Sequence, residues 1–217
     1  MKNILKNKIT RLRIKIRKLS NPYLAPLRRL WGGVKKPFTI ISNNCWGGLV
    51  YQYYNLEYDT PTIGLYFFAN DYIKFISNLK YYLSLDLHFI NYKMSAHKET
   101  IVQKGHTEKP IGILGDIEIV FLHYKSEKEA MEKWNRRKQR IHWDNLFIKF
   151  SEMNECTKEC LLIFDKLSFS NKIVLVSKDY GLKSQIIVKS FTRDNEVYDD
   201  TTKFREGLSL SKWLTNK

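Results

Sequence analysis

Phe38-Thr-Ile-Ile-Ser-Asn-Asn-Cys45-Trp-Gly-Gly48 is the stretch of sequence that decides the fold. A short apolar strand runs here into a polar turn with a cysteine and two glycines, and residues 48–54 are expected to form a short helix. A strand, a turn and a helix in direct succession are typical of α/β proteins, which place ligands at the ends of their strands. The stretch therefore predicts an α/β domain with a functional site at this turn.

Further strands and helices alternate along the chain after this turn, as periodic apolar positions indicate. Ser126 and Glu129 form a capping box, which satisfies free backbone groups where a helix begins. We therefore expect a single α/β domain over residues 38–217, with a mixed or mostly parallel sheet flanked by helices. Residues 91–110 lack a clear period and predict a loop or mobile connection. The predicted strands are 62–67, 117–122, 145–150 and 172–177, and the predicted helices begin near Asp71, Ser126 and Thr157.

The basic charge of the chain is concentrated at its N-terminus. The formal net charge is +15. Residues 1–36 contain twelve Lys and Arg residues and no Asp or Glu. Residues 1–37 are therefore expected to form a basic amphipathic helix and a linker, the helix ending at the prolines of residues 21–26. Its apolar stripe consists of Leu5, Ile9, Leu12, Ile16 and Leu19.

A basic amphipathic helix suits an anionic membrane surface, so we expect residues 1–30 to bind one. A stripe docked on the domain, a partner helix and a disordered nucleic-acid-binding arm are the alternatives. Nucleic acid is disfavoured because the domain itself carries little basic excess. No segment reaches the roughly 20 apolar residues of a membrane span, and no secretory signal is recognisable, so a cytoplasmic protein peripheral to the inner membrane is expected.

Cys45 is the first candidate catalytic residue, because a strand-to-helix turn favours a thiolate or a bound anion. A buried cysteine without a chemical role is the alternative. The neighbouring Asn43 and Asn44 are candidates for substrate binding, or they satisfy a tight turn.

The segment 115–124 supplies a second group of candidates. Alternation along a regular strand places His123 on one face, and Asp116 and Glu118 on the other. Glu118 interrupts an apolar face, so we expect it to pair with a cation or to act as a general base. His123 is the other candidate base, and Asp116 is a candidate for substrate binding.

The segment 133–145 is dense in hydrogen-bond donors and aromatic rings. Arginines can hold a phosphate with two hydrogen bonds, and tryptophan faces stack on sugars or bases. Ion pairing within the protein explains the same residues equally well. The candidates for substrate binding here are Asn135, Arg136, Arg137, Arg140, Trp143, Asp144 and Asn145, and Trp46 joins them from the first turn.

The sequence lacks the motifs of several common classes of enzyme and nucleotide-binding protein. There is no Walker loop, no Gly-x-Gly-x-x-Gly fingerprint, no Gly-x-Ser-x-Gly elbow and no zinc-binding His-Glu-x-x-His. The three cysteines give neither a disulfide framework nor a zinc-site spacing. The sequence therefore predicts no metal site and leaves any cofactor unknown.

Several stretches together resemble one bacterial family, the one catalogued as domain of unknown function 1919. Its members are often labelled exopolysaccharide or capsule biosynthesis proteins. The resemblance covers roughly residues 38–180 and rests on these words: Ile41-Ser-Asn-Asn-Cys-Trp-Gly-Gly48, Thr60-Pro-Thr-Ile-Gly-Leu65, Asp71-Tyr-Ile-Lys-Phe75, Gly115-Asp-Ile-Glu-Ile119, His123-Tyr124, Lys133-Trp-Asn-Arg-Arg137 and Trp143-Asp-Asn-Leu-Phe147.

The resemblance implies a transferase of surface-polysaccharide assembly that acts on a phosphate-containing sugar donor or a lipid-linked glycan. In this hypothesis the arginines of segment 133–145 hold phosphate, Trp143 or Trp46 packs on a sugar, and His123 or Glu118 deprotonates the acceptor. One alternative is a cysteine hydrolase or acyltransferase that uses Cys45. Another is a non-catalytic accessory protein of glycan assembly at the membrane.

Overall fold

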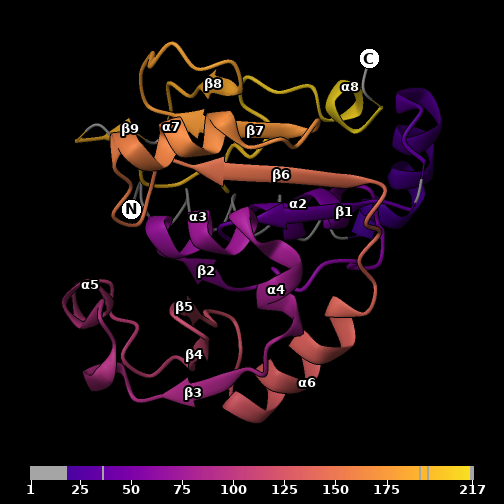
Figure 1. Cartoon of the computed structure of the whole chain (residues 1–217). Helices are drawn as coiled ribbons and strands as arrows, with labels where there is room; N and C mark the ends of the chain where they lie inside the picture. Colours follow the sequence, from indigo (N-terminus) through magenta and orange to yellow (C-terminus); the bar gives the residue numbers. More distant parts are fainter. Residues whose placement is uncertain (1–18, 36, 191, 195, 216–217) are drawn as a thin grey trace, which may run out of the picture.

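A four-stranded parallel sheet forms the upper half of the molecule in Figure 1. The computed structural model describes residues 19–35, 37–190, 192–194 and 196–215. Every neighbouring pair of strands in this sheet, called sheet A, is parallel, and Thr39 of the first strand pairs with Leu146. The strands lie in the order β1 (Thr39–Ser42), β6 (Leu146–Ser151), β7 (Lys172–Val176) and β8 (Gln185–Ile187).

A second, antiparallel sheet, called sheet B, lies below the first in Figure 1. Its strands lie in the order β2 (Tyr66–Phe67), β5 (Ile117–Val120), β4 (Ile111–Leu114) and β3 (His88–Ile90). The predicted α/β fold with a mostly parallel sheet is confirmed, and sheet B is added to it. The strand predicted over 62–67 was too long, because residues 60–64 form a turn. The prediction of a loop over 91–110 was wrong in part, since η1 (Tyr92–Met94) and α5 (Lys98–Gln103) lie there.

Two helices of the domain begin at a residue whose side chain satisfies a free backbone N–H group. The hydroxyl of Ser126 accepts a hydrogen bond from the backbone N–H of Glu129 at 3.2 Å, as the capping box predicts. Thr157 caps a further helix in the same way. The helices of the domain are α2 (Trp46–Tyr53), α3 (Ala69–Ser77), α4 (Leu79–Ser84), α6 (Glu127–Lys138), α7 (Lys158–Lys166) and α8 (Leu210–Thr215), and β9 (Thr192–Arg193) and β10 (Glu196–Val197) form a small ribbon.

Helix α3 lies between the two sheets and joins them into one core (Figure 1). The buried hydroxyl of Tyr72 lies 3.0 Å from the carbonyl oxygen of Ile41 and 2.9 Å from that of Lys149, at the centre of sheet A. On the opposite face of sheet A, α2 and α8 cover a second apolar cluster that includes Trp46 and Phe147. Both faces of sheet A are therefore buried, as is usual for a parallel sheet.

The N-terminal helix (residues 19–32) continues through both prolines, so the prediction that residues 21–26 end it was wrong. Contacts with the domain hold it in place: Ala25 is buried, and Arg28 donates to the backbone oxygen of Tyr53 at 2.9 Å. The helix ends at Gly33, whose positive φ of 64° is typical of a helix C-terminus. Most of the predicted amphipathic stripe, from Leu5 to Ile16, lies outside the described residues. No helix in the described ranges combines the length and apolarity that a membrane crossing needs.

Candidate functional site

The carboxyl ends of β1 and β6 lie side by side in sheet A, and both lead into polar segments. Asn43, Asn44 and Cys45 follow β1. Ser151 is the last residue of β6, and residues 152–155 follow it. In parallel sheets, ligands commonly bind outside the carboxyl ends of the strands. Two clusters of polar side chains flank this edge, one on each face of sheet A.

Asn43 fastens the two strand ends together. Its side-chain amide donates to the backbone oxygen of Ser151 at 3.2 Å, and its side-chain oxygen accepts from the backbone N–H of Ser151 at 3.1 Å. Because Asn43 is fully buried and both ends of its amide are bonded, it acts here as a structural clamp between β1 and β6.

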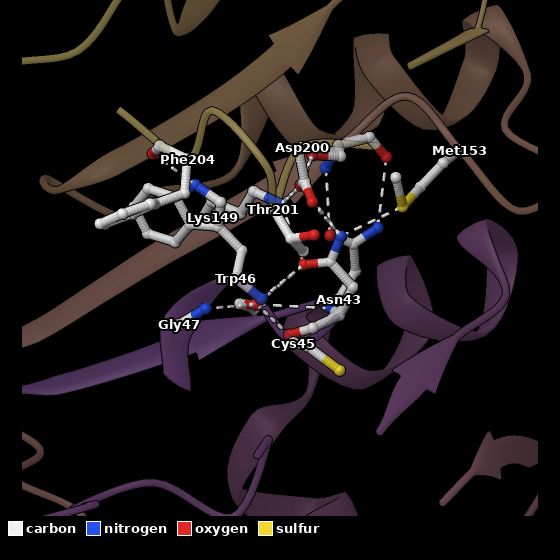
Figure 2. A network of polar contacts seen from close by, with 12 residues as sticks. Asn43, Cys45, Trp46, Gly47, Lys149, Met153, Asp200, Thr201 and Phe204 are labelled. Atoms are coloured by element: carbon white, nitrogen blue, oxygen red, sulfur yellow. Dashed lines mark hydrogen bonds and ion pairs between the residues drawn. The ribbon is translucent and has the colours of Figure 1, made fainter. Parts of the chain in front are cut away.

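The first cluster surrounds a buried ion pair between Lys149 on β6 and Asp200 (Figure 2). The side chain of Asn44 donates to both oxygens of Asp200, at 3.0 and 2.9 Å, and its oxygen accepts from the Lys149 ammonium at 3.1 Å. The hydroxyl of Ser151 donates to Asp200 at 2.6 Å. The Lys149 ammonium also lies 5.5 Å from the ring centroid of Trp46. Burial lowers the pKa of Lys149, and the negative charge of Asp200 acts in the opposite direction.

Cys45 lies at the N-terminal end of α2, beside this cluster. Its sulfur is 3.7 Å from the backbone oxygen of Leu65. Burial and the negative charge of Asp200 raise the pKa of the Cys45 thiol to about 11, and the Lys149 ammonium acts in the opposite direction. The strand-to-helix turn was expected to favour a thiolate, but burial and the charge of Asp200 outweigh that effect. Cys45 is therefore a neutral thiol near pH 7.

The second cluster holds His97 between two carboxylates on the other face of sheet A. Its Nε2 lies 3.2 Å from Asp71 on α3, and its Nδ1 lies 2.7 Å from Glu155 after β6. The ring stacks on Phe68, with a centroid distance of 3.6 Å and an interplanar angle of 8°. Burial alone would lower the pKa of His97, but the hydrogen bonds and charges of Asp71 and Glu155 outweigh it and raise the pKa.

Glu118 supports this second cluster from β5. Its carboxylate accepts hydrogen bonds from the backbone N–H of Ala96, at 2.8 Å, and from the hydroxyl of Ser95. Its own backbone N–H donates to Asp71 at 3.1 Å. The partners of Glu118 are therefore neutral donors and not the expected cation, and they fix the segment that carries His97.

A cavity of about 380 Å³ opens beside Glu155, the partner of His97 Nδ1. Asn154 and Glu155 have positive φ values of 57° and 66°, a strained conformation that aims the segment after β6 into the cavity. The carboxylate of Glu155 also accepts from the hydroxyl of Thr100. The lining side chains combine both charges with an aromatic ring: Thr100, Gln103, Lys104, Asn154, Glu155, Arg193, Asp194, Glu196 and Tyr198.

The other predicted residues of segment 115–124 are hydrogen-bonded to neither cluster, although His123 contacts Gly64, the residue before the Leu65 oxygen that lies 3.7 Å from the Cys45 sulfur. His123 is exposed in the turn after β5, and its backbone N–H donates to the oxygen of Gly64 at 2.9 Å. Asp116 is exposed in the β4–β5 hairpin, where it accepts from Lys74 and from Tyr82, each at 2.7 Å. Strand β5 ends at Val120, so alternation along a strand does not reach His123, which lies exposed in the turn while Glu118 is buried in the strand.

Two of the three arginines of segment 133–145, Arg137 and Arg140, already contact protein partners. Arg137 is buried and donates to the hydroxyl of Tyr124 at 2.7 Å. Arg140 pairs with Glu57, whereas Arg136 is exposed and Asn135 is half-buried on α6.

The remaining candidates of this segment lie at the amino end of sheet A, before β6. The side chain of Asn145 donates to the backbone oxygen of Pro37 at 2.7 Å. Trp143 is exposed with the Lys80 ammonium 5.3 Å from its ring, and Asp144 is exposed beside it. Trp46, by contrast, is fully buried, and its indole donates to the oxygen of Phe204 at 2.8 Å. The structure therefore places Trp143, Asp144 and Asn145 at the opposite end of β1 and β6 from Asn44 and Cys45.

The sequence interpretation missed the residues at the centre of both clusters: Lys149, Asp200, His97 and Glu155. Lys149 could have been found, because it interrupts an apolar strand in the same way as Glu118. Asp200, His97 and Glu155 lie in segments without a period, and only the folded chain brings them together. Among the described residues, no group of three or more His, Cys, Asp or Glu side chains is placed to hold a metal ion.

Comparison with known proteins identifies the family of the chain but no activity. A protein of Haemophilus influenzae (strain Rd) described as an uncharacterized protein is 34% identical over 188 residues, which cover 82% of this chain and 84% of the relative. The model of one family matches residues 26–214, a range that includes both clusters and the second half of the described N-terminal helix. The chain therefore belongs to the family described as Domain of unknown function (DUF1919).

Proposed function

We propose that this protein is a transferase of bacterial surface-polysaccharide assembly, with its reacting groups at the carboxyl end of sheet A. The observation that carries the proposal is the arrangement Asp71–His97–Glu155, in which the last carboxylate lines a cavity of about 380 Å³. A histidine held between two carboxylates beside a cavity is a common source of general acid–base catalysis. The labels of the resembling family members favour a glycan as substrate.

In the proposed reaction Glu155 accepts the proton of an acceptor hydroxyl in the cavity. The freed oxygen forms a bond to the transferred group, and the bond from that group to the donor phosphate breaks, leaving its electron pair on the phosphate. His97 donates a hydrogen bond to Glu155 and so keeps this carboxylate oriented, and Asp71 holds the other ring nitrogen.

The lining of the cavity suits a phosphate-containing sugar. Lys104 and Arg193 offer two cations for the leaving phosphate, and Arg193 also lies 3.7 Å from Asp194 and 5.4 Å from the centroid of the Tyr198 ring. Tyr198 offers an aromatic ring for a sugar, in place of the buried Trp46. The identity of the transferred group is open, and an acyl, a glycosyl or a phosphoryl group fits the same scheme.

The proposal includes a location at the inner surface of the cytoplasmic membrane, where lipid-linked glycans are assembled. The twelve cations of residues 1–36 support it, because anionic lipids attract each basic side chain near the surface by about 1 kcal/mol.

The test is the composition of the surface polysaccharide, by NMR and mass spectrometry, after deletion of the gene and after its restoration. Deletion is expected to remove one defined substituent or sugar, which the restored gene returns. An unchanged composition and yield, under conditions in which the protein is made, would contradict the proposal. A lower yield of unchanged composition would instead favour the accessory protein. Failure of Cys45→Ser to restore the substituent, with a covalent adduct trapped on Cys45 of the wild type, would favour the cysteine enzyme.

A further inference from the structure

The N-terminal helix packs against the domain with its polar side and turns its apolar side outward. A surface helix of a soluble protein normally does the reverse. On the inner side lie Ala25, which is buried, and Asn21, Arg28 and Arg29, which are hydrogen-bonded to the domain. This reversed orientation of the polar and apolar sides indicates that the outer side of the helix contacts a partner outside the domain.

The outer side is apolar along the whole described length of the helix. Tyr23, Leu30 and Trp31 are 80%, 75% and 81% exposed. At 100° per residue these side chains lie opposite Ala25. Contiguous exposed apolar surface of this kind marks an interaction site, because an isolated monomer would normally bury it. The outward face consists of Leu19, Tyr23, Leu24, Leu27, Leu30 and Trp31.

Fixed contacts with the domain determine the direction of the outward face. Arg28 donates to the backbone oxygen of Tyr53 at 2.9 Å and stacks over the ring of the same residue at 4.5 Å. Asn21 donates to the oxygen of Gln52 at 2.6 Å, and Arg29 donates to that of Tyr54. These acceptors lie at the C-terminal end of α2, so the helix cannot rotate its apolar side inward without breaking all of these bonds.

We propose that the outward face docks the protein on an anionic lipid surface, with the apolar side chains in the headgroup boundary. Tyr and Trp are the residues that favour this boundary. Residues 1–36 contain no Asp or Glu. Of their twelve Lys and Arg, the ten other than Arg28 and Arg29, which are bonded to the domain, complement a negative surface. A second copy of the chain is disfavoured as the partner, because a symmetric contact would bring two such basic segments together.

Docking by this face determines which end of the domain meets the bilayer. The N-terminal helix lies at the end of the molecule where β1 and β6 begin, whereas the cavity beside Glu155 lies where β6 ends (Figure 1). The cavity then opens away from the lipid and meets a water-soluble donor or the distal part of a long glycan. This consequence for the substrate rests on the proposed function of the cavity, and the docking itself does not.

The test compares full-length wild type with the variant Tyr23→Ser/Leu27→Ser/Leu30→Ser/Trp31→Ser in co-sedimentation with lipid vesicles. Vesicles of phosphatidylcholine and phosphatidylglycerol are compared with vesicles of phosphatidylcholine alone. The matched control is Met94→Ser/Leu162→Ser/Ile163→Ser, which removes exposed apolar side chains elsewhere. Circular dichroism and sedimentation velocity confirm that all three proteins are folded and report their oligomeric state.

Wild type and control are expected to bind the mixed vesicles, and the four-residue variant is expected to bind at least about ten-fold more weakly, since one large apolar side chain already contributes roughly that factor. Vesicles with brominated acyl chains should quench a component of the fluorescence that Trp31→Phe removes. Equal binding by the variant would overturn the inference, and so would a wild-type dimer that the variant converts to a monomer without any vesicle binding. No polysaccharide is measured, so failure here leaves the proposed reaction standing.

Discussion

The ammonium group of Lys149 and the carboxylate of Asp200 form an ion pair that is closed to water, with side chains 0% and 1% exposed. Asp200 belongs to the segment after β10, and Lys149 belongs to the centre of sheet A. The pair therefore ties the C-terminal part of the chain to the strand ends that carry the candidate site. Hydrogen bonds from Asn44 and Ser151 to Asp200 reduce the cost of burying these charges.

Lys149→Met is expected to lower the free energy of unfolding by about 3–5 kcal/mol, because it leaves the buried Asp200 charge without its cation. The double variant Lys149→Met/Asp200→Leu should lose less than the sum of the two single variants, since it leaves no unpaired charge. Urea unfolding followed by circular dichroism measures all four proteins. Additive losses would show that the two groups do not depend on each other.

The pairing of His97 makes stability depend on pH. Its folded-state pKa is raised above the ordinary value of 6.5, so its contribution is fully present below that value and is lost as the pH rises through the folded pKa. The loss of unfolding free energy caused by His97→Gln should therefore be larger at about pH 6 than at about pH 9. His88→Gln, on the exposed edge strand β3, is the control and should show no such difference. An equal loss at both pH values would mean that folding does not raise the pKa of His97.

Cys45 is expected to react slowly with iodoacetamide near neutral pH, because burial and Asp200 raise its pKa to about 11. Asp200→Asn removes the second cause and should speed alkylation of Cys45, as measured by mass spectrometry of the labelled peptide. A wild-type rate at pH 7 well above that of a free thiol would show an activated cysteine, and would revive the cysteine-enzyme alternative.

Asp116→Asn is expected to change the unfolding free energy by less than about 1 kcal/mol, because its ion pair with Lys74 is exposed to solvent. The variant should also restore polysaccharide composition as well as the wild-type gene does, since the side chain of Asp116 is bonded to Lys74 and Tyr82 and not to the residues of either cluster. Loss of the polysaccharide substituent with unchanged protein level would return Asp116 to the candidate site.

Local patterns were enough to predict the framework of the domain. The apolar run before Ser42 predicted β1, and the side-chain caps Ser126 and Thr157 located the starts of α6 and α7. These predictions succeed because each depends on residues close together in the chain. The prediction that the prolines at 22 and 26 end the N-terminal helix was wrong for the opposite reason. Contacts of Arg28 and Arg29 with residues that are distant in the chain stabilise this helix.

The candidate site could be predicted only in part. The turn at Asn44 and Cys45 was identified, because a strand-to-helix turn has a local signature. The partner of Asn44 is Asp200, which is 156 positions away, and Glu155 meets His97 across 58 positions. Neither pairing has a periodic signal, so spacing could not bring these residues into one site.

The most direct test of the central claim is the amount of the deletion-sensitive polysaccharide substituent that His97→Gln restores, measured by NMR against restoration by the wild-type gene. His88→Gln serves as the matched control, and immunoblotting establishes equal protein levels. The account predicts full restoration by His88→Gln and little or none by His97→Gln, because His97 orients the carboxylate that accepts the proton. Full restoration by His97→Gln would contradict it and would show that the reaction, if this protein performs one, takes place elsewhere in the molecule.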